Sequence, residues 1–344
     1  MDSVLDYRSD TVTLATPAMR QAMMQAEVGD DILGEDPTVK RLEAAGAALF
    51  GKEAALFVVS GTMANQIAVM ALTERGHEVL VGEDSHIYNL EVGGLAALSG
   101  VQARPLRATE GRFDPRVLKA AVRPSGLQTA VTKLLCLENT YDLNRGIPLP
   151  ADYIAQVSDL AHAAGLMVYL DGARIFNAAA ALAADVRSLC QPVDAMQVCL
   201  SKGLAAPVGS LLLGSGAFIA KARWLRQRLG GGMRQAGHMA AACLVALETM
   251  RDRLGEDHDN ARLLAEGLAA IDERLVDLSL PMTNVVQVEL GPLGFDSGHA
   301  ARLLLERGIK VKPISPTACR MITHWGISSS DVEATLATMR GLLV

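Results

Sequence analysis

The feature that most constrains the fold is a regular alternation of short apolar runs with longer segments of helical periodicity. Within one of the longer segments, Met63, Ile67 and Met70 fall on a single helical face. Six of the apolar runs have the length of buried strands, at residues 54–59, 78–81, 134–137, 166–170, 196–200 and 210–213. This strand–helix alternation predicts an α/β fold with a mostly parallel sheet covered by helices.

The pattern changes towards the C-terminus. A long helical stretch is predicted at about residues 239–264, on either side of Arg251. Beyond it we expect strands at residues 276–280, 284–290, 309–313 and 320–324, and helices at 298–307 and 330–343. Ser330 and Glu333 have the spacing of a capping box, which predicts the start of the last helix. We therefore expect two domains, a large one with an N-terminal arm (1–250) and a small α+β one (251–344).

Charge and composition exclude several classes of protein. The 344 residues carry a net charge of -6, so no basic surface for nucleic acid or an anionic membrane is expected. No run of 18 apolar residues occurs, and the acidic, polar start at residues 1–8 predicts no signal peptide. Five widely spaced cysteines predict buried thiols and neither a disulfide framework nor a metal site. We expect a cytoplasmic protein.

A first candidate for ligand binding follows the strand predicted at residues 54–59. Ser60, Gly61 and Thr62 open the next helix, where free backbone N–H groups and the helix dipole attract anions. The two hydroxyls add donors, and the glycine allows a close approach. The segment therefore predicts a phosphate site, although a simple helix N-cap explains the same residues.

A second candidate ends the strand predicted at residues 166–170. A carboxylate such as Asp171 at a strand end can hold the protonated ring nitrogen of a pyridine cofactor, and Arg174 is near enough in sequence to face the same cleft. The alternative is a helix N-cap followed by a solvated arginine.

Lys202 ends the strand predicted at residues 196–200 and is followed by the largely apolar segment 203–208. A lysine in these surroundings can act as a nucleophile, whereas the alternative is an exposed strand-end lysine. His86 follows the strand at 78–81, where an imidazole can stack on a cofactor ring and act near the reacting bond; the alternative is a histidine with a structural hydrogen bond. Together these segments supply a phosphate cup, an acid for a ring nitrogen and a Schiff-base lysine, which are the parts that pyridoxal phosphate requires.

Ordered sequence blocks resemble the low-specificity L-threonine aldolases, a family of fold-type I pyridoxal phosphate enzymes. The resemblance covers nearly the whole chain. The blocks are Tyr7-Arg8-Ser9-Asp10-Thr11-Val12-Thr13, Gly34-Glu35-Asp36-Pro37-Thr38, Ser60-Gly61-Thr62-Met63-Ala64-Asn65, Asp84-Ser85-His86-Ile87, Leu137-Glu138-Asn139-Thr140, Asp171-Gly172-Ala173-Arg174, Ser201-Lys202-Gly203-Leu204 and Arg320-Met321-Ile322-Thr323-His324.

The resemblance implies a role for each matching residue. Lys202 looks like the Schiff-base lysine, Asp171 like the partner of the pyridine nitrogen, and His86 like the ring-stacking histidine. Gly61 and Thr62 look like phosphate ligands. The substrate carboxylate clamp is implied to consist of Ser9, Arg174 and Arg320, and Arg234 resembles a residue that reaches the cofactor of a neighbouring subunit. The family is tetrameric, with active sites at a dimer interface.

The implied reaction is the retro-aldol cleavage of L-threonine, L-allo-threonine and related β-hydroxy-α-amino acids to glycine and an aldehyde. Another fold-type I enzyme, such as a β-eliminating lyase or an aminotransferase, and an aldolase preferring L-phenylserine stay open as alternatives, as does a non-catalytic oligomeric scaffold. A nucleotide-binding Rossmann protein is disfavoured, since no Gly-x-Gly-x-x-Gly follows the first strand. Leu33, Gln128 and Tyr141-Asp142 depart from the family pattern at positions near the substrate side chain, so they bear on substrate range.

Overall fold

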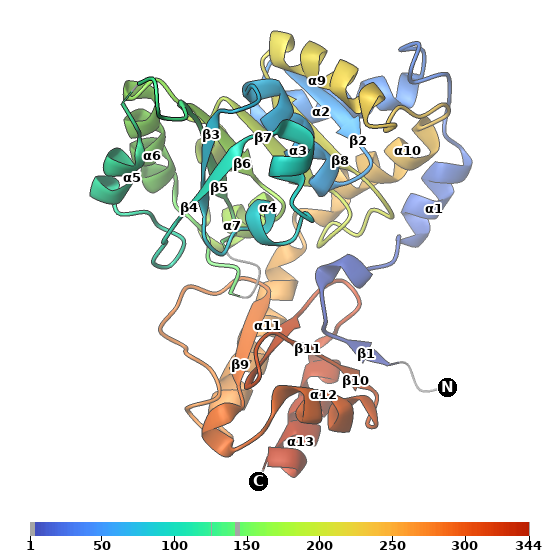
Figure 1. Cartoon of the computed structure of the whole chain (residues 1–344). Coiled ribbons are helices and arrows are strands. Elements are labelled where there is room, and N and C mark those ends of the chain that lie inside the picture. Colours follow the sequence, from blue (N-terminus) through green and yellow to red (C-terminus); the bar gives the residue numbers. More distant parts are fainter. Residues whose placement is uncertain (1–3, 125, 142–144, 344) are drawn as a thin grey trace.

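The computed structural model describes residues 4–124, 126–141 and 145–343, and its centre is a seven-stranded sheet (Figure 1). The strand order is β2-β8-β7-β6-β5-β3-β4. Neighbours run parallel from β4 to β7, whereas β8 is antiparallel to both β7 and β2. The strands are β2 (Ala54–Val58), β3 (Glu78–Gly82), β4 (Gln102–Leu106), β5 (Thr132–Glu138), β6 (Met167–Asp171), β7 (Ala195–Cys199) and β8 (Ser210–Gly214). The predicted α/β class with a mostly parallel sheet is confirmed.

The sequence pattern located six of these strands and missed β4. This strand reads Gln-Ala-Arg-Pro-Leu and lies at the edge of the sheet, where only Leu106 is buried. An edge strand tolerates Pro105, because one side of its backbone has no partner strand. A half-exposed strand of this kind has no apolar run by which to recognise it.

Alternate side chains of the central strands enter two separate hydrophobic cores. In β2, Leu56 enters one core with Ile67, whereas Phe57 enters the other with Leu42. The first core is covered by α3 (Gly61–Leu72), α4 (His86–Asn89), a π-helical turn (Leu95–Ser99) and α9 (Gly216–Arg228). The second is covered by α1 (Pro17–Met24), α2 (Pro37–Phe50), α5 (Pro115–Ala121), α6 (Ala151–Ala163), α7 (Ile175–Ala181), α8 (Val186–Cys190) and α10 (Gly237–Val245).

The C-terminal part has its own core and two small sheets, and lies below the large sheet in Figure 1. One sheet is antiparallel, with β12 (Ala318–Ile322) between β11 (Lys312–Pro313) and β9 (Val285–Glu289). In the other, the N-terminal β1 (Leu5–Asp6) pairs with β10 (Ile309–Lys310). The helices are α11 (Leu254–Ala269), α12 (Ser297–Leu305), α13 (Ser329–Leu343) and a 3₁₀ turn (Gly291–Leu293).

The N-terminal residues tie the two parts together. Tyr7 lies in the core of the C-terminal part, and the 3₁₀ turn Asp10–Val12 begins three residues later. Thr13 then donates a hydrogen bond from its hydroxyl to the backbone oxygen of Lys202, at 2.9 Å. The domain boundary near residue 250 stays a prediction. None of the helices in the described ranges has the length and apolar character that crossing a membrane requires.

Three local expectations for the C-terminal half are wrong. The long helix predicted at 239–264 is two helices, because a π-helical turn (Ala246–Met250) and a bend separate α10 from α11. Residues 276–280 form no strand, since the Asp277 carboxylate accepts from the backbone N–H of Ser279 and closes a turn. The capping box of α13 is formed by Ser328 and Asp331, each of which accepts the other's backbone N–H.

Candidate active site

The residues proposed for cofactor chemistry meet at the carboxyl ends of the parallel strands, as open α/β sheets predict. A cavity of about 230 Å³ lies there between the ends of β5, β6 and β7 and the start of α3. Its lining includes the predicted residues Ser60, Gly61, Thr62, His86, Asp171, Arg174 and Lys202. It also includes Thr11, Asn65, Glu138, Thr140, Ala173, Gln197, Cys199 and Ser201.

The start of α3 forms one wall of this cavity. Ser60 is the N-cap of the helix, and its hydroxyl accepts from the backbone N–H of Met63 at 3.1 Å. At Gly61 a Cβ atom would lie 2.7 Å from Cys199 Sγ, so a larger residue cannot be accommodated without movement. The simple N-cap is therefore present, and it does not preclude anion binding by the other free N–H groups of the first turn.

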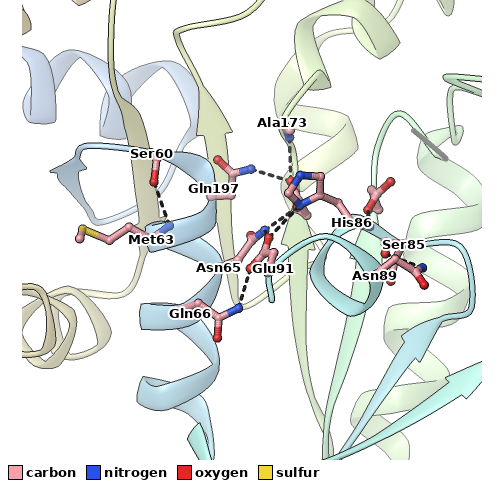
Figure 2. A network of polar contacts seen from close by, with 12 residues as sticks. Ser60, Met63, Asn65, Gln66, Ser85, His86, Asn89, Glu91, Ala173 and Gln197 are labelled. Atoms are coloured by element: carbon pink, nitrogen blue, oxygen red, sulfur yellow. Dashed lines mark hydrogen bonds and ion pairs between the residues drawn. The ribbon is translucent and has the colours of Figure 1, made fainter. Parts of the chain in front are cut away.

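Asp171 ends β6 and accepts three hydrogen bonds, from Asn65, Ala173 and Gln197, and these three donors are labelled in Figure 2. Its Oδ1 accepts from Gln197 Nε2 at 2.5 Å and from the backbone N–H of Ala173 at 3.0 Å. Its Oδ2 accepts from Asn65 Nδ2 at 2.7 Å. The carboxylate is thus buried, oriented and on the cavity wall, which suits it to receive a hydrogen bond from a protonated ring nitrogen.

His86 begins α4 and is anchored at two points. Its backbone N–H donates to Glu138 Oε2 at 2.6 Å, and its ring Nδ1 lies 2.9 Å from Glu91 Oε1. Glu91 is buried, and it also accepts from the side chains of Asn65 and Gln66. His86, Glu91 and Asp171 together offer three possible metal-ligand atoms within 4.8 Å of one another, but the carboxylates already accept the hydrogen bonds described above.

Arg174 is paired with a carboxylate that the predicted site did not include. It donates to Asp10 through Nη2 at 2.6 Å and through Nε at 2.8 Å, and both side chains are buried. Burial alone would raise the pKa of Asp10, but Arg174, with Lys202 and Arg320 nearby, holds it far below its usual range. Arg174 therefore lines the cavity with its positive charge balanced by Asp10 and its guanidinium group held in a fixed orientation.

The remaining predicted residues do not line the cavity in this chain. Arg320 on β12 is buried and donates to the backbone oxygen of Arg8 at 2.9 Å, while Ser9 caps the Asp10–Val12 turn. Arg234 is largely exposed and pairs with Asp30 at 2.8 Å. The structure thus brings Arg320 close to Asp10 and leaves Arg234 on the surface.

Comparison with known proteins identifies the family. The beta-eliminating lyase family model matches residues 6–290. The chain is 48% identical to the Arabidopsis thaliana protein named "Probable low-specificity L-threonine aldolase 2", over 97% of this chain and 95% of that one. It is 40% identical to the low specificity L-threonine aldolase of Escherichia coli K12, over 99% of both. This chain belongs to the low-specificity L-threonine aldolase family.

Solved structures agree on the fold of this aldolase family member. A Leishmania major threonine aldolase superposes with a TM-score of 0.83 at 19% identity, covering 99% of this chain and 100% of that one. A Sphingomonas wittichii serine palmitoyltransferase superposes with a TM-score of 0.78 at 18% identity, covering 98% and 86%. At such low identity the likeness shows the fold alone, and it confirms the predicted fold-type I architecture.

Of the four positions at which this family member departs from the family pattern, Leu33, Gln128 and Tyr141 lie in the described ranges, and none of these three lines the cavity. Leu33 and Gln128 are exposed and do not line it. Tyr141 is buried beside β3, where its hydroxyl accepts from the backbone N–H of Asp84 at 3.3 Å. Asp142 lies outside the described residues. Their predicted bearing on substrate range stays a prediction.

Proposed function

We propose that this chain cleaves L-threonine, L-allo-threonine and related β-hydroxy-α-amino acids to glycine and an aldehyde, with pyridoxal phosphate bound to Lys202. The observation that carries the proposal is the meeting of Lys202, Asp171 and the start of α3 around one cavity. Family membership supports the same activity, because relatives of this chain bear the name of that reaction.

The residues present suit this cofactor. The Asp171 carboxylate is oriented by three donors, which supports its assignment as the acceptor of a pyridinium N–H. The glycine at position 61 keeps the first turn of α3 open, and Ser60 and Thr62 flank it. When bound, pyridoxal phosphate supplies an electron sink for the bond that breaks at Cα. Lys202 would hold the cofactor covalently, and Ser60, Gly61 and Thr62 would hold its phosphate.

We assign substrate orientation to Arg174, which lines the cavity; the assignment of Arg320 and Ser9 to the same role rests on the family resemblance alone, since neither lines the cavity in this chain. Arg174 already faces the cavity in a fixed orientation, and a guanidinium binds a carboxylate through two parallel hydrogen bonds. Holding the carboxylate fixes rotation about the Cα–N bond, so that Cα–Cβ becomes the bond that is cleaved. Positioning of this kind lowers a barrier by several kcal/mol.

Proton removal from the β-hydroxyl is assigned to His86, either directly or through a water that it holds. The imidazole lines the cavity and is a common general base at neutral pH. When Cα–Cβ breaks, the hydroxyl proton passes to the base and the carbonyl of the aldehyde forms. A proton is then returned to Cα, and glycine leaves.

Product analysis tests this function. L-Threonine, L-allo-threonine and L-phenylserine are each supplied to the purified protein, and aldehyde and glycine are measured together. We expect equal amounts of both, and we expect Lys202→Ala to lose both the visible absorption of the lysine-bound cofactor and the cleavage. Lys119→Ala, which changes an exposed lysine on α5, is the matched control and keeps both. Unchanged cleavage by Lys202→Ala would overturn the assignment.

A β-eliminating lyase is the second candidate, and the name of the matching family model is the observation that favours it. It would use the same lysine and carboxylate. The products separate the two functions, since elimination releases a keto acid and ammonia, whereas cleavage releases glycine and an aldehyde.

We also propose a cytoplasmic homotetramer with active sites at a dimer interface. Exposed apolar side chains near the N-terminus support an interface, among them Leu14, Met24 and Leu33. Arg234 lies exposed beyond this chain's own cavity, as a residue that serves a neighbouring subunit would. Mixing inactive Lys202→Ala with inactive Arg234→Ala subunits should restore part of the activity, because some hybrid sites then have both residues. No restoration after verified subunit exchange would contradict the shared site, and light scattering measures the tetramer.

A further inference from the structure

Glu91 contacts His86 directly, yet it ends no strand and carries none of the roles assigned above. We propose that Glu91 is a positioning residue for the cleavage reaction. Its buried carboxylate holds the hydrogen of His86 Nδ1, which leaves Nε2 as the nitrogen that takes the β-hydroxyl proton. This inference rests on the proposed function, and it adds the group that prepares the base.

The geometry around Glu91 fixes the direction of this hydrogen bond. Its Oε1 lies 2.9 Å from His86 Nδ1 and 2.6 Å from Asn65 Nδ2, and its Oε2 lies 2.5 Å from Gln66 Nε2 (Figure 2). Because both Glu91 oxygens already accept from side-chain amide N–H groups, we assign the hydrogen of the His86 contact to Nδ1, which then donates to Oε1. Nε2 makes no hydrogen bond within the described ranges, and the ring lines the cavity with 29% of its side chain exposed.

A buried tyrosine fixes the amide that links Glu91 to the cofactor site. Tyr169 donates from its hydroxyl to Asn65 Oδ1 at 2.7 Å. Burial first, and then the nearby carboxylates of Asp171 and Glu91, raises the pKa of Tyr169 well above its usual value, so the hydroxyl keeps its hydrogen. Asn65 therefore directs its Nδ2 towards both Glu91, at 2.6 Å, and Asp171, at 2.7 Å. The Asn65 side chain thus fixes the position of Glu91, which contacts His86, relative to Asp171, the predicted partner of the pyridine nitrogen.

Two substitutions of Glu91 distinguish the effect of its hydrogen bond to His86 from the effect of its negative charge. In Glu91→Gln the amide oxygen can keep its bonds to His86 and Asn65 if the new NH₂ group faces Gln66. Gln66 Oε1 is buried and has no hydrogen-bond partner in the described part of the chain, so rotation of its amide would satisfy that NH₂. Glu91→Leu, in contrast, removes the acceptor altogether.

The first test requires no cofactor. Histidine-labelled apoprotein is studied by two-bond nitrogen–proton NMR, and the His86 signals are assigned by their loss in His86→Asn. We expect the Nδ1–H form in the wild type and in Glu91→Gln, and the Nε2–H form or a mixture in Glu91→Leu. An Nε2–H form in the wild type would overturn the proposal.

Steady-state kinetics of the holoenzyme with L-threonine provide the second test. Glu91→Leu should lower kcat about a hundredfold, a typical contribution of general base catalysis, and change KM less than about threefold. Glu91→Gln should recover kcat to within about tenfold of the wild type, since an acceptor for Nδ1–H remains. Asn89→Ala is the matched control: its side-chain amide anchors the same short helix by donating to the backbone oxygens of Glu83 and Ser85, and its kcat should stay within about threefold.

Exchange of the glycine α-hydrogen in D₂O separates failure of this inference from failure of the proposed function. Exchange requires the lysine-bound cofactor but no β-hydroxyl, so Glu91→Leu should retain it while losing cleavage. If the wild type neither cleaves L-threonine nor exchanges glycine, the proposed function fails. If Glu91→Leu keeps its kcat, or loses exchange as severely as cleavage, the role assigned to Glu91 fails even though the aldolase assignment stands.

Discussion

Arg174 donates two hydrogen bonds to the buried carboxylate of Asp10, at 2.6 and 2.8 Å, and so approaches the cavity with a fixed orientation. Asp10→Asn would keep the size of the side chain but provide a single oxygen and no charge. We expect KM for L-threonine to rise about tenfold or more, because a buried charge-assisted pair is broken and the clamp loses its alignment. Asp6→Asn, which breaks the more exposed Asp6–Arg8 pair, is the matched control and should change KM less than about twofold.

The Asp10–Arg174 pair also gives the protein a pH-dependent stability. The pKa of Asp10 is lower in the folded state than in an unfolded chain. Its contribution is therefore complete above the unfolded value of about 3.9 and is lost as the pH falls towards the lower folded value. We expect the difference in unfolding free energy between the wild type and Asp10→Asn, measured by urea titration, to shrink from pH 5 downwards. A constant difference down to pH 3 would contradict this.

Gly61 provides a separate test of the proposed phosphate site. A Cβ at this position would lie 2.7 Å from Cys199 Sγ, inside the cavity wall. Gly61→Ala should therefore displace the first turn of α3 and weaken pyridoxal phosphate binding at least about tenfold. The dissociation constant is measured by titrating apoprotein and following cofactor absorption. Gly255→Ala, in α11 with open space around it, should bind the cofactor normally, so equal weakening in both variants would count against the phosphate site.

The candidate site residues that sequence reasoning brought to the cavity all follow apolar runs. Asp171 and Lys202 could be assigned because a buried strand has a recognisable length, and its carboxyl end has a known role in an α/β sheet. Asn65, Glu91 and Gln197 were not assigned roles because they lie within a helix, a loop and a strand. A signal for two of them was present: Asn65 interrupts an apolar helix and Gln197 an apolar strand. Polar groups in buried elements require partners, and here the partners are the site itself.

The fold, like the site, was predictable where an apolar run marks a buried strand. Strands buried on both faces appear as continuous apolar runs, which is why β5, β6 and β7 were found. β4 was missed, and the turn at Asp277 was predicted as a strand, because both structures depend on their surroundings: a free sheet edge in one case and a side-chain hydrogen bond in the other. The entry of the N-terminus into the C-terminal sheet depends on the pairing of β1 with β10, more than 300 residues away, and no local pattern indicates it.

His258 should make the protein less stable in mild acid. Burial lowers its pKa to about 4, and its Nε2 lies 3.2 Å from Asn177 Nδ2. The unfolded chain takes up a proton near pH 6.5, whereas the folded protein does so only near 4, so the stability supplied by the neutral ring is lost as the pH falls between these values. We expect the unfolding free energy of the wild type to fall more steeply from pH 7 to pH 4 than that of His258→Gln. Parallel curves would show that His258 has no such effect.

The last helix tests the corrected capping assignment. Ser328 Oγ accepts the backbone N–H of Asp331 at 3.3 Å, and Asp331 Oδ2 accepts the backbone N–H of Ser328 at 2.9 Å. Ser328→Ala removes one half of this reciprocal pair and should lower the unfolding free energy by about 1 kcal/mol. Glu333→Ala, at the position that the sequence spacing had suggested, should lower it by less than about 0.5 kcal/mol, as for an exposed side chain outside the cap. Urea titration of both variants under the same conditions measures the difference. A larger loss of unfolding free energy in Glu333→Ala than in Ser328→Ala would instead support the capping box of Ser330 and Glu333, because α13 would then depend on the carboxylate at position 333.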